Sequence, residues 1–329
     1  MSKKKKIIIG VVAVILILCG GIGYYAHTKY AKVKHTDLNE KKLTVNKEME
    51  EKNTTYTNIA FFGIDVHSDD AKDVESDAVV IASLNTDTKE VRLLSIYGNA
   101  YLTSADGKKI AVKDIYKNGA EDAVEILNRN LDLDISHFAT VNFKALIEVI
   151  DAVGGIEVDV KEDEVPHITG YTADLIKVTG KDSMGITQAG PQLLNGTQAT
   201  AYCRIRATEG GDTVRAERQK LVLSKTVEKL KTMSLADLDQ LIDKVFPQIE
   251  TNYKLTEVTD YAKDMTAYQI NDMEGFPFTI ENKKIEGNED GIATKDLKND
   301  VTKLHQQFFP DLSYSASDNV KKADEILKK

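Results

Sequence analysis

The chain has 329 residues, 42% of them hydrophobic, and a formal net charge of −9. This length accommodates one large domain or two ordinary ones, and the composition is typical of a globular protein. The four lysines at positions 3–6 carry +4, so the remainder of the chain carries −13. Such an acidic body argues against nucleic acid as a partner, because binding to a phosphate backbone requires a basic face.

An apolar stretch follows these lysines. Residues 7–25 are 19 uncharged and mostly apolar positions, which is long enough to span a bilayer as one helix. Positive residues stay on the cytoplasmic side, so residues 1–6 are predicted to be cytoplasmic and about 300 residues to lie outside the cell. The alternative is a cleaved signal peptide, but the apolar core of a signal peptide has only ~7–15 residues. We therefore predict an uncleaved single-pass anchor in the cell membrane.

The rest of the chain divides by composition. Residues 26–55 are polar and rich in Lys and Glu, which predicts a juxtamembrane stalk. The folded body is expected over residues 56–310, and the polar residues 311–329 predict a loosely held tail. Cys19 in the apolar stretch and Cys203 in the body cannot plausibly pair. The body is therefore expected to fold without disulfides.

The first half of the body predicts a hairpin of buried strands. Residues 57–64, 78–84 and 90–96 each read as a strand, and the second and third are joined by a short turn at 85–88. Helices and strands then alternate, with helices at 120–130 and 143–151 and strands at 137–142 and 156–160.

The second half predicts a loop, a short strand and several helices. Residues 180–198 contain Pro and Gly and read as a loop, residues 201–205 as a strand, and residue 214 to about 231 as a long helix. Further elements follow, with helices at 235–250 and 255–265, a strand region at 270–280 and a last helix within 293–309. This alternation predicts an α/β layered domain with a mixed sheet.

Basic side chains gather between residues 199 and 223. Arg204 and Arg206 are two apart at the end of the predicted strand, so both are expected on one face of the sheet. A Glu-Gly-Gly turn then leads to the long helix. Guanidinium groups at the start of a helix are well suited to hold a phosphate or pyrophosphate group. The alternative is a set of solvated surface arginines that form weak salt bridges.

The long helix contributes the second part of this junction. Asp212 or Thr213 is expected to cap it at Val214. Arg215 and Gln219 are four residues apart and share one helical face, with Arg218 close by. These side chains are expected at the rim of a buried apolar face.

Two aspartates flank neighbouring strand ends. Asp65 follows the first predicted strand and Asp77 precedes the second. Two carboxylates together with phosphate oxygens are what a Mg²⁺ site requires. The alternative is that each is a loop or cap aspartate, which is the commoner role of a single Asp.

In the order of these motifs the chain resembles the LytR-CpsA-Psr family, over about residues 56–310. The resemblance rests on the lysine-led anchor and on Phe61-Phe62-Gly63-Ile64-Asp65, Glu75-Ser76-Asp77, Leu93-Leu94-Ser95-Ile96, Val141-Asn142-Phe143, Asp151-Ala152-Val153-Gly154-Gly155-Ile156-Glu157-Val158-Asp159, Leu194-Asn195-Gly196-Thr197-Gln198-Ala199, and Arg204 through Gln219.

The resemblance implies a three-layer α/β/α fold with a hydrophobic pocket for a polyprenyl chain. Members of this family act outside the cytoplasmic membrane of mainly Gram-positive bacteria. They transfer anionic glycopolymers, such as wall teichoic acid or capsule, from a polyprenyl pyrophosphate to peptidoglycan. The resemblance implies Mg²⁺ as the cofactor, with Mn²⁺ as the alternative ion. The reaction is a phosphoryl transfer, in which positioning and charge neutralisation supply most of the rate.

The resemblance also implies roles for single residues. Asp65 and Asp77 match the family's metal-binding carboxylates, and Asp77 also counts among the catalytic residues. The catalytic pyrophosphate-binding group matches Arg204, Arg206, Arg215 and Gln219, with Arg218 assigned to the same phosphates and Asp212 beside them.

Three positions depart from the family pattern. Glu75 stands where the family usually has an arginine, and Gly98 and Asn99 stand where it has an arginine and an aspartate. Each lost charged contact to a phosphate weakens stabilisation of the transition state by a few kcal/mol. Two hypotheses follow. One is an active glycopolymer phosphotransferase with a modified headgroup site. The other is a regulatory or scaffolding homologue that binds polyprenyl phosphates with little catalysis.

Overall fold

The computed structural model describes residues 28–65, 74–209, 211–230, 232–264, 267–282, 285 and 291–329. The anchor predicted at residues 7–25 lies outside these ranges. Within them, no helix is both long and apolar enough to cross a membrane. The described residues form two compact units: unit 1 contains residues 28–35 and those described within 141–270, and unit 2 contains residues 36–65, 74–140 and those described within 271–329.

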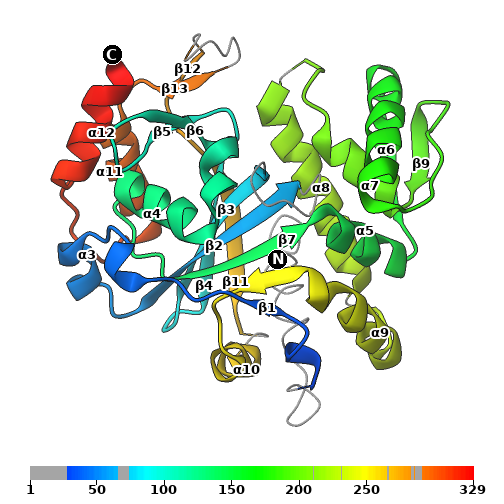
Figure 1. Cartoon of the computed structure of the whole chain (residues 1–329), viewed down its shortest axis with the longest axis horizontal. Coiled ribbons are helices and arrows are strands. Elements are labelled where there is room, and N and C mark those ends of the chain that lie inside the picture. Colours follow the sequence, from blue (N-terminus) through cyan, green and yellow to red (C-terminus); the bar gives the residue numbers. More distant parts are fainter. Residues whose placement is uncertain are drawn as a thin grey trace. The chain divides into compact units, whose positions relative to one another are not determined.

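Unit 2 is organised around the predicted hairpin. β3 (Glu75–Asn85) pairs antiparallel with both β2 (Tyr56–Asp65) and β4 (Glu90–Ile96), which confirms the three strands and their turn. The strand order continues on both sides as β7-β2-β3-β4-β11, with β7 at His137–Asn142 and β11 at Gln269–Phe276 (Figure 1). Buried aliphatic side chains of β3 and β4 supply much of its core.

Three helices pack beside this sheet in unit 2. α4 (Ala120–Leu131) confirms the predicted helix, and α11 (Leu297–Phe308) lies in the predicted final region. α12 (Asp318–Lys328) packs against both of them (Figure 1). Val320 and Leu327 of α12 are buried in the core, so the prediction of a loose C-terminal tail is wrong. Lysines between its apolar positions concealed the amphipathic pattern.

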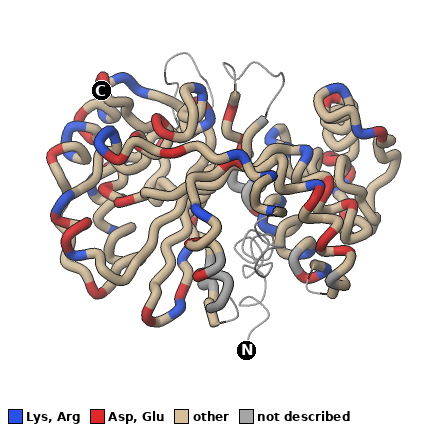
Figure 2. The backbone as a smooth tube through the Cα atoms, turned by 60° about the horizontal axis from the view of Figure 1, so that its bottom comes forward, with Lys and Arg blue, Asp and Glu red and all other residues tan. Residues whose placement is uncertain are grey.

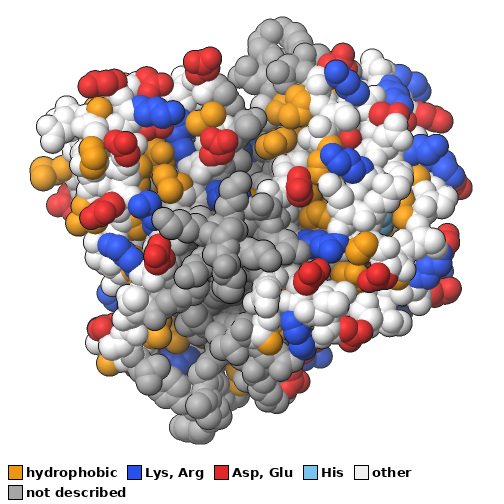
Figure 3. All heavy atoms as spheres, turned by 180° about the vertical axis from the view of Figure 1, so that it is seen from behind, with side chains coloured by type: hydrophobic (Ala, Val, Ile, Leu, Met, Phe, Trp, Pro, Cys, Tyr) orange, Lys and Arg blue, Asp and Glu red, His pale blue; other side chains and the backbone are white. Residues whose placement is uncertain are grey.

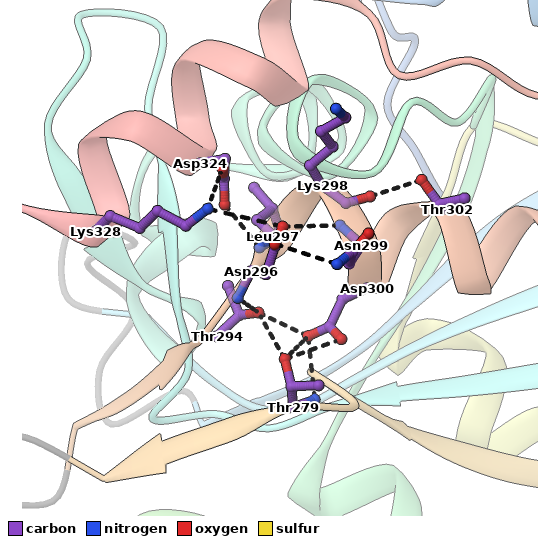
Figure 4. A network of polar contacts seen from close by, with 10 residues as sticks. All are labelled: Thr279, Thr294, Asp296, Leu297, Lys298, Asn299, Asp300, Thr302, Asp324 and Lys328. Atoms are coloured by element: carbon purple, nitrogen blue, oxygen red, sulfur yellow. Dashed lines mark hydrogen bonds and ion pairs between the residues drawn. The ribbon is translucent and has the colours of Figure 1, made fainter.

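Polar contacts hold the end of unit 2 together. The buried Asp300 accepts hydrogen bonds from the hydroxyls of Thr279 and Thr294, at 3.0 and 2.6 Å (Figure 4). Lys328 of α12 forms ion pairs with Asp324 at 2.6 Å and with Asp296 at 3.8 Å. The Asp300 bonds tie α11 to the segments before it, and the Lys328–Asp296 pair ties α12 to the start of α11.

The predicted stalk belongs to the folded units. In unit 2, Leu43 and Met49 are buried in the core, and the Lys42 ammonium lies 2.6 Å from a Glu121 carboxylate oxygen of α4. In unit 1, β1 (Lys34–His35) pairs in parallel with β10 (Ile249–Thr251). The stalk prediction is therefore wrong for the described residues 28–55. Few apolar residues in a Lys/Glu-rich segment are enough to fix it in place.

Smaller elements complete unit 2. They are η2 (Glu40–Lys42), α3 (Lys47–Lys52), β5 (Tyr101–Thr103), β6 (Lys109–Ala111), η4 (Val112–Asn118), β12 (Ile280–Asn282) and β13 (Ile292–Thr294).

Unit 1 is mainly helical. Its elements are α5 (Phe143–Ala152), β8 (Ile156–Val160), η5 (Glu162–Glu164), α6 (Val165–Thr179), β9 (Gly190–Leu194), α7 (Gly196–Arg204), α8 (Gly211–Leu230), α9 (Leu235–Val245), η6 (Phe246–Gln248), β10 and α10 (Leu255–Asp264). A second core, separate from that of unit 2, lies among α5, α6, α7, α8 and the β8-β9 pair.

The predictions for residues 180–198 and 201–205 of unit 1 are wrong. The segment 180–198, predicted as a loop, contains β9, which pairs antiparallel with β8. The strand predicted at 201–205 is the end of helix α7. Asn195 and Gln198 form a capping box at its start, because each side chain bonds the other's backbone N–H. This start signal outweighs the β-branched and aromatic residues further along.

The prediction of an α/β fold with mixed strand directions is confirmed. Antiparallel pairing dominates in unit 2, whereas β1 and β10 of unit 1 are parallel. Figure 2 shows acidic and basic residues interspersed over the described parts of both units. On the face drawn in Figure 3, hydrophobic side chains are exposed in small groups between charged ones. The charges are thus mixed by sign over what is described of the surface.

Candidate functional site

The arginine junction of unit 1 connects two helices. α7 ends at Arg204, the loop at 205–209 contains Arg206, and α8 begins at Gly211. The prediction that Arg204 and Arg206 share one face of a strand is therefore wrong. The Arg204 guanidinium lies 4.9 Å from the ring centre of Phe143 and 5.2 Å from that of Tyr171. Cation–π contacts of this kind orient a guanidinium without consuming its N–H donors.

Helix α8 buries part of the basic cluster. Arg215 is 5% exposed and Val222, seven residues later, is 1% exposed, so Arg215 belongs to the buried face rather than to its rim. The Gln219 amide donates to the carbonyl of Cys203 at 3.5 Å, which joins α8 to the end of α7. Because α8 begins at Gly211, Asp212 and Thr213 lie in its first turn and do not precede it as caps.

Arg218 is the most fully engaged member of the cluster. Its Nε donates to the Glu164 carboxylate at 2.9 Å, its Nη1 to the Ile205 carbonyl at 3.1 Å, and its Nη2 to the Thr208 hydroxyl at 2.6 Å. Its side chain is 3% exposed, and that of Glu164 is 2% exposed. The junction thus brings Arg218 and Gln219 to the end of α7, as the sequence predicted, but with Arg218 already bonded within the protein.

The raised pKa values of two neighbouring side chains reflect the low polarity of this region. Burial raises the pKa of the Cys203 thiol to about 12, against the opposing influence of Arg218 and Arg215. Burial, followed by the charge of Glu164, raises the pKa of Tyr202 to about 12. Cys203 therefore remains a thiol at neutral pH, and a thiol is a poorer nucleophile than a thiolate.

The two candidate metal-binding aspartates lie at one end of the β2-β3 ladder, in unit 2. Asp65 pairs in register with Glu75, and the pairing shifts between Gly63 and Ile64. Asp77 falls in this irregularity, between the partners of those two residues. Irregularities in a ladder often redirect a side chain beside an active site.

The three divergent positions lie close together in unit 2. The Glu75 carboxylate is 3.6 Å from the ammonium of Lys113, the second residue of η4. The Gly98 carbonyl accepts from the Lys113 N–H at 2.8 Å, and the Asn99 carbonyl accepts from the Ile292 N–H at 2.9 Å. The Ser76 hydroxyl donates to the Val112 carbonyl at 2.9 Å. η4 therefore places a lysine beside the position where the family usually has an arginine.

The carboxylates of Asp65 and Asp77 are ligands of the type that a magnesium ion prefers. Mg²⁺ is typically held by one or two carboxylates together with substrate phosphates and water. The β2-β3 register places Asp65 and Asp77 at the same end of the two strands, as such a site needs. Among the side chains that the structure describes, no group of three or more His, Cys, Asp or Glu could hold a metal.

A comparison with protein-family models identifies the family. The model described as the LytR_cpsA_psr family matches residues 22–306. The chain belongs to the LytR-CpsA-Psr family. The resemblance found in the sequence is thereby confirmed, and the match extends beyond the predicted body at its N-terminal end.

Similar proteins include a transferase and a regulatory protein. The Bacillus subtilis polyisoprenyl-teichoic acid–peptidoglycan teichoic acid transferase TagT is 27% identical over 269 residues, which are 78% of this chain and 80% of TagT. Biofilm regulatory protein A of Streptococcus mutans is 25% identical over 238 residues, which are 64% of this chain and 55% of that protein.

Solved structures share the fold. The LytR-CPS2A-psr family protein YwtF (TagT) with bound octaprenyl pyrophosphate lipid aligns with a TM-score of 0.57 at 20% identity, over 84% of this chain and 99% of that one. This likeness supports the LytR-CpsA-Psr fold for the chain.

Two residues of the site were not predicted from the sequence. Glu164 lies in a run of acidic residues that gives no sign of burial, and Lys113 lies in a short helix without a motif. The spacing of Glu164 three residues after Lys161, just before a helix with Pro166 in its first turn, was the available signal for a capping role.

Proposed function

We propose that the chain transfers an anionic glycopolymer, of the teichoic acid or capsule type, from a polyprenyl pyrophosphate carrier to peptidoglycan. The observation that supports this most strongly is the intact arginine junction of a LytR-CpsA-Psr family member. Arg204, Arg206, Arg215 and Gln219 are clustered at the α7–α8 connection. Guanidinium groups in a largely buried setting bind phosphate oxygens more strongly than solvated ones do.

The proposed reaction is a phosphoryl transfer. A hydroxyl oxygen of the acceptor bonds to the phosphorus next to the sugar, and the bridging P–O bond breaks. The polyprenyl phosphate leaves with the electron pair, and the hydroxyl proton is released. The arginines neutralise the charge that develops on the phosphate oxygens. Asp65 and Asp77 would hold Mg²⁺, or Mn²⁺ in its place, which supplies further neutralisation when bound.

The proposal includes the setting of the reaction. Residues 7–25 would anchor the chain in the cytoplasmic membrane, with residues 1–6 inside and the body outside the cell. A hydrophobic pocket in the body would accept the polyprenyl chain. This arrangement brings the membrane-held carrier and the wall acceptor to the same protein.

A catalytically weak homologue that binds polyprenyl phosphates is the second candidate. The observation that favours it is Glu75, whose carboxylate adds negative charge beside the proposed metal site and pairs with Lys113. Under this alternative the protein has a regulatory or scaffolding role.

A single assay distinguishes the two candidates. The full-length chain in detergent is incubated with a polyprenyl-pyrophosphate-linked teichoic acid precursor, peptidoglycan and Mg²⁺. Transferase activity predicts release of polyprenyl phosphate and attachment of the glycan to the wall material, both lost on chelation. Binding of the precursor without release would support the second candidate, and failure to bind it would exclude both.

A further inference from the structure

A buried ion pair connects η5 with α8 in unit 1. Arg218 and Glu164 are 3% and 1% exposed, respectively. Removing two charges from water is costly unless the pair is close and its remaining groups are hydrogen-bonded. Here both carboxylate oxygens are used, because Oε1 accepts from Arg218 Nε and Oε2 accepts from the Lys161 N–H, each at 2.9 Å. The geometry meets the requirement for a stable buried pair.

The same guanidinium holds the loop that follows α7. Its Nη1 donates to the carbonyl of Ile205 and its Nη2 to the hydroxyl of Thr208. Arg206 lies between these two anchored residues, and Arg204 directly precedes the first. One side chain therefore fixes both sides of the residue that is expected to contact pyrophosphate.

We propose that Glu164 and Arg218 are positioning residues, which hold the segment 205–208 so that Arg206 is presented to a pyrophosphate group. This inference rests on the proposed function. In this arrangement Arg218 acts through the loop rather than as the phosphate contact, since each of its three nitrogens already donates within the protein. This positioning role replaces the direct phosphate-binding role that the sequence predicted for Arg218.

A buried pair suits positioning because it has few alternative arrangements. The planar guanidinium has fixed donor directions, so three acceptors at hydrogen-bond distance define its place. The Tyr202 ring, with its centre 5.7 Å from the guanidinium carbon, packs on the same group. A displacement of about 1 Å at a catalytic site can cost a hundredfold in rate. The pair can thus affect the reaction without contacting the substrate.

The first test follows the loop itself and needs no ligand. Hydrogen exchange is measured on the full-length chain in detergent, comparing wild type with Glu164→Gln and, as the matched control, Glu162→Gln at an exposed position of η5. The inference predicts at least tenfold faster exchange of the backbone amides in 205–209 for Glu164→Gln only, with α12 of unit 2 unchanged. Unaltered exchange in 205–209 would overturn it.

The second test separates positioning from stability. Glu164→Leu combined with Arg218→Met removes both buried charges and keeps apolar volume, so its thermal midpoint should remain within a few degrees of wild type. Its affinity for octaprenyl pyrophosphate in detergent should still fall at least tenfold, because the bonds to Ile205 and Thr208 are gone. Wild-type affinity in this stable double variant would refute the positioning role. If wild type itself does not bind the lipid, the proposed function fails, whereas the exchange experiment still decides the role of the pair.

Discussion

At the scale of single residues, the charge beside the proposed metal site is inverted. Glu75 pairs in register with Asp65 and precedes Asp77 by two residues. A third carboxylate here opposes the approach of phosphate groups, and the neighbouring Lys113 offsets it only in part at 3.6 Å. The substitution thus lies where it affects the substrate headgroup more than the fold.

The first prediction reverses this charge. Glu75→Arg should raise the turnover of the transfer reaction by about tenfold or more, because a charged contact to phosphate contributes a few kcal/mol to the transition state. Steady-state rates with the lipid-linked precursor measure the effect. The control is Glu90→Arg at the other end of the hairpin, which should leave the rate unchanged. An unaltered rate for Glu75→Arg would mean that Glu75 does not limit catalysis.

A second residue-scale feature is a buried histidine in unit 2. His305 of α11 is 1% exposed, donates from Nε2 to the Leu131 carbonyl at 2.8 Å, and stacks on Tyr314 with ring centres 3.8 Å apart. Burial lowers the pKa of His305 to about 4 from its usual 6.5, although the Leu131 carbonyl and Asp132 oppose the shift. The imidazole is therefore neutral in the folded protein at pH 7.

The second prediction follows from this pKa. Between pH 6.5 and about 4 the unfolded chain binds the proton more readily than the folded one, so the free energy of unfolding decreases as pH falls. The contribution of His305 is complete above about pH 6.5, and about 3 kcal/mol of it is lost near pH 4. Urea unfolding at several pH values measures this loss. In His305→Gln this part of the pH dependence should vanish, and an identical slope in both proteins would refute the assignment.

At the scale of elements, a close helix contact explains one glycine of the motif at 194–199. A Cβ on Gly196 would lie 2.3 Å from the Ile147 carbonyl oxygen of α5 and 2.8 Å from an Asp151 carboxylate oxygen. That carboxylate also accepts a hydrogen bond from the Gly196 N–H at 2.7 Å. The glycine lets α7 start directly against α5, which fixes the helix that ends in Arg204.

The third prediction tests this contact. Gly196→Ala should lower the free energy of unfolding by about 1–3 kcal/mol, because the added methyl group meets backbone atoms that cannot move away cheaply. The matched control is Gly170→Ala in α6, where a Cβ would meet nothing within 4 Å. That change should be neutral or stabilise by about 0.4–1 kcal/mol. Equal effects of the two substitutions in urea unfolding would contradict the packing argument.

The sequence predicted those elements whose pattern has one reading. The β2-β3-β4 strands are continuous apolar runs separated by a clear turn, and α4 has a strong helical period. α7 was misread because its short Ala-Thr-Ala-Tyr-Cys run fits a strand as well as a helix, and only the Asn195–Gln198 capping box decides between them. α12 was missed because its polar composition conceals three buried apolar positions.

The candidate site was predictable to a smaller extent. Residue spacing predicted that Arg215 and Gln219 lie on one helix, near the end of the segment that contains Arg204. The structure bears this out. Spacing could not reveal that Arg218 is paired with Glu164, because the two residues are 54 positions apart and meet only in the folded unit. Glu164, which most alters the role predicted for Arg218, is thus a partner that only the tertiary structure reveals.

At the scale of the whole molecule, the C-terminal residues are part of the folded core, although the sequence predicted a loosely held tail. Leu327 of α12 is 2% exposed and belongs to the core of unit 2. The fourth prediction is that Leu327→Ala lowers the free energy of unfolding by about 2–5 kcal/mol, because it removes buried surface and leaves a cavity. Lys322→Ala on the exposed side of α12 is the control and should change it by less than about 0.5 kcal/mol. A small effect of both would indicate that α12 is not part of the stable core.

The central claim for the whole molecule is that its arginine junction binds a polyprenyl pyrophosphate. The most direct measurement is the affinity of the full-length chain in detergent for octaprenyl pyrophosphate, with wild type compared with Arg215→Ala and with Lys220→Ala as control. The account predicts binding by wild type and the control, and a loss of about a hundredfold or more for Arg215→Ala, because a charged contact to pyrophosphate is removed from a buried setting. Equal affinity in all three proteins, or no binding by wild type, would contradict it.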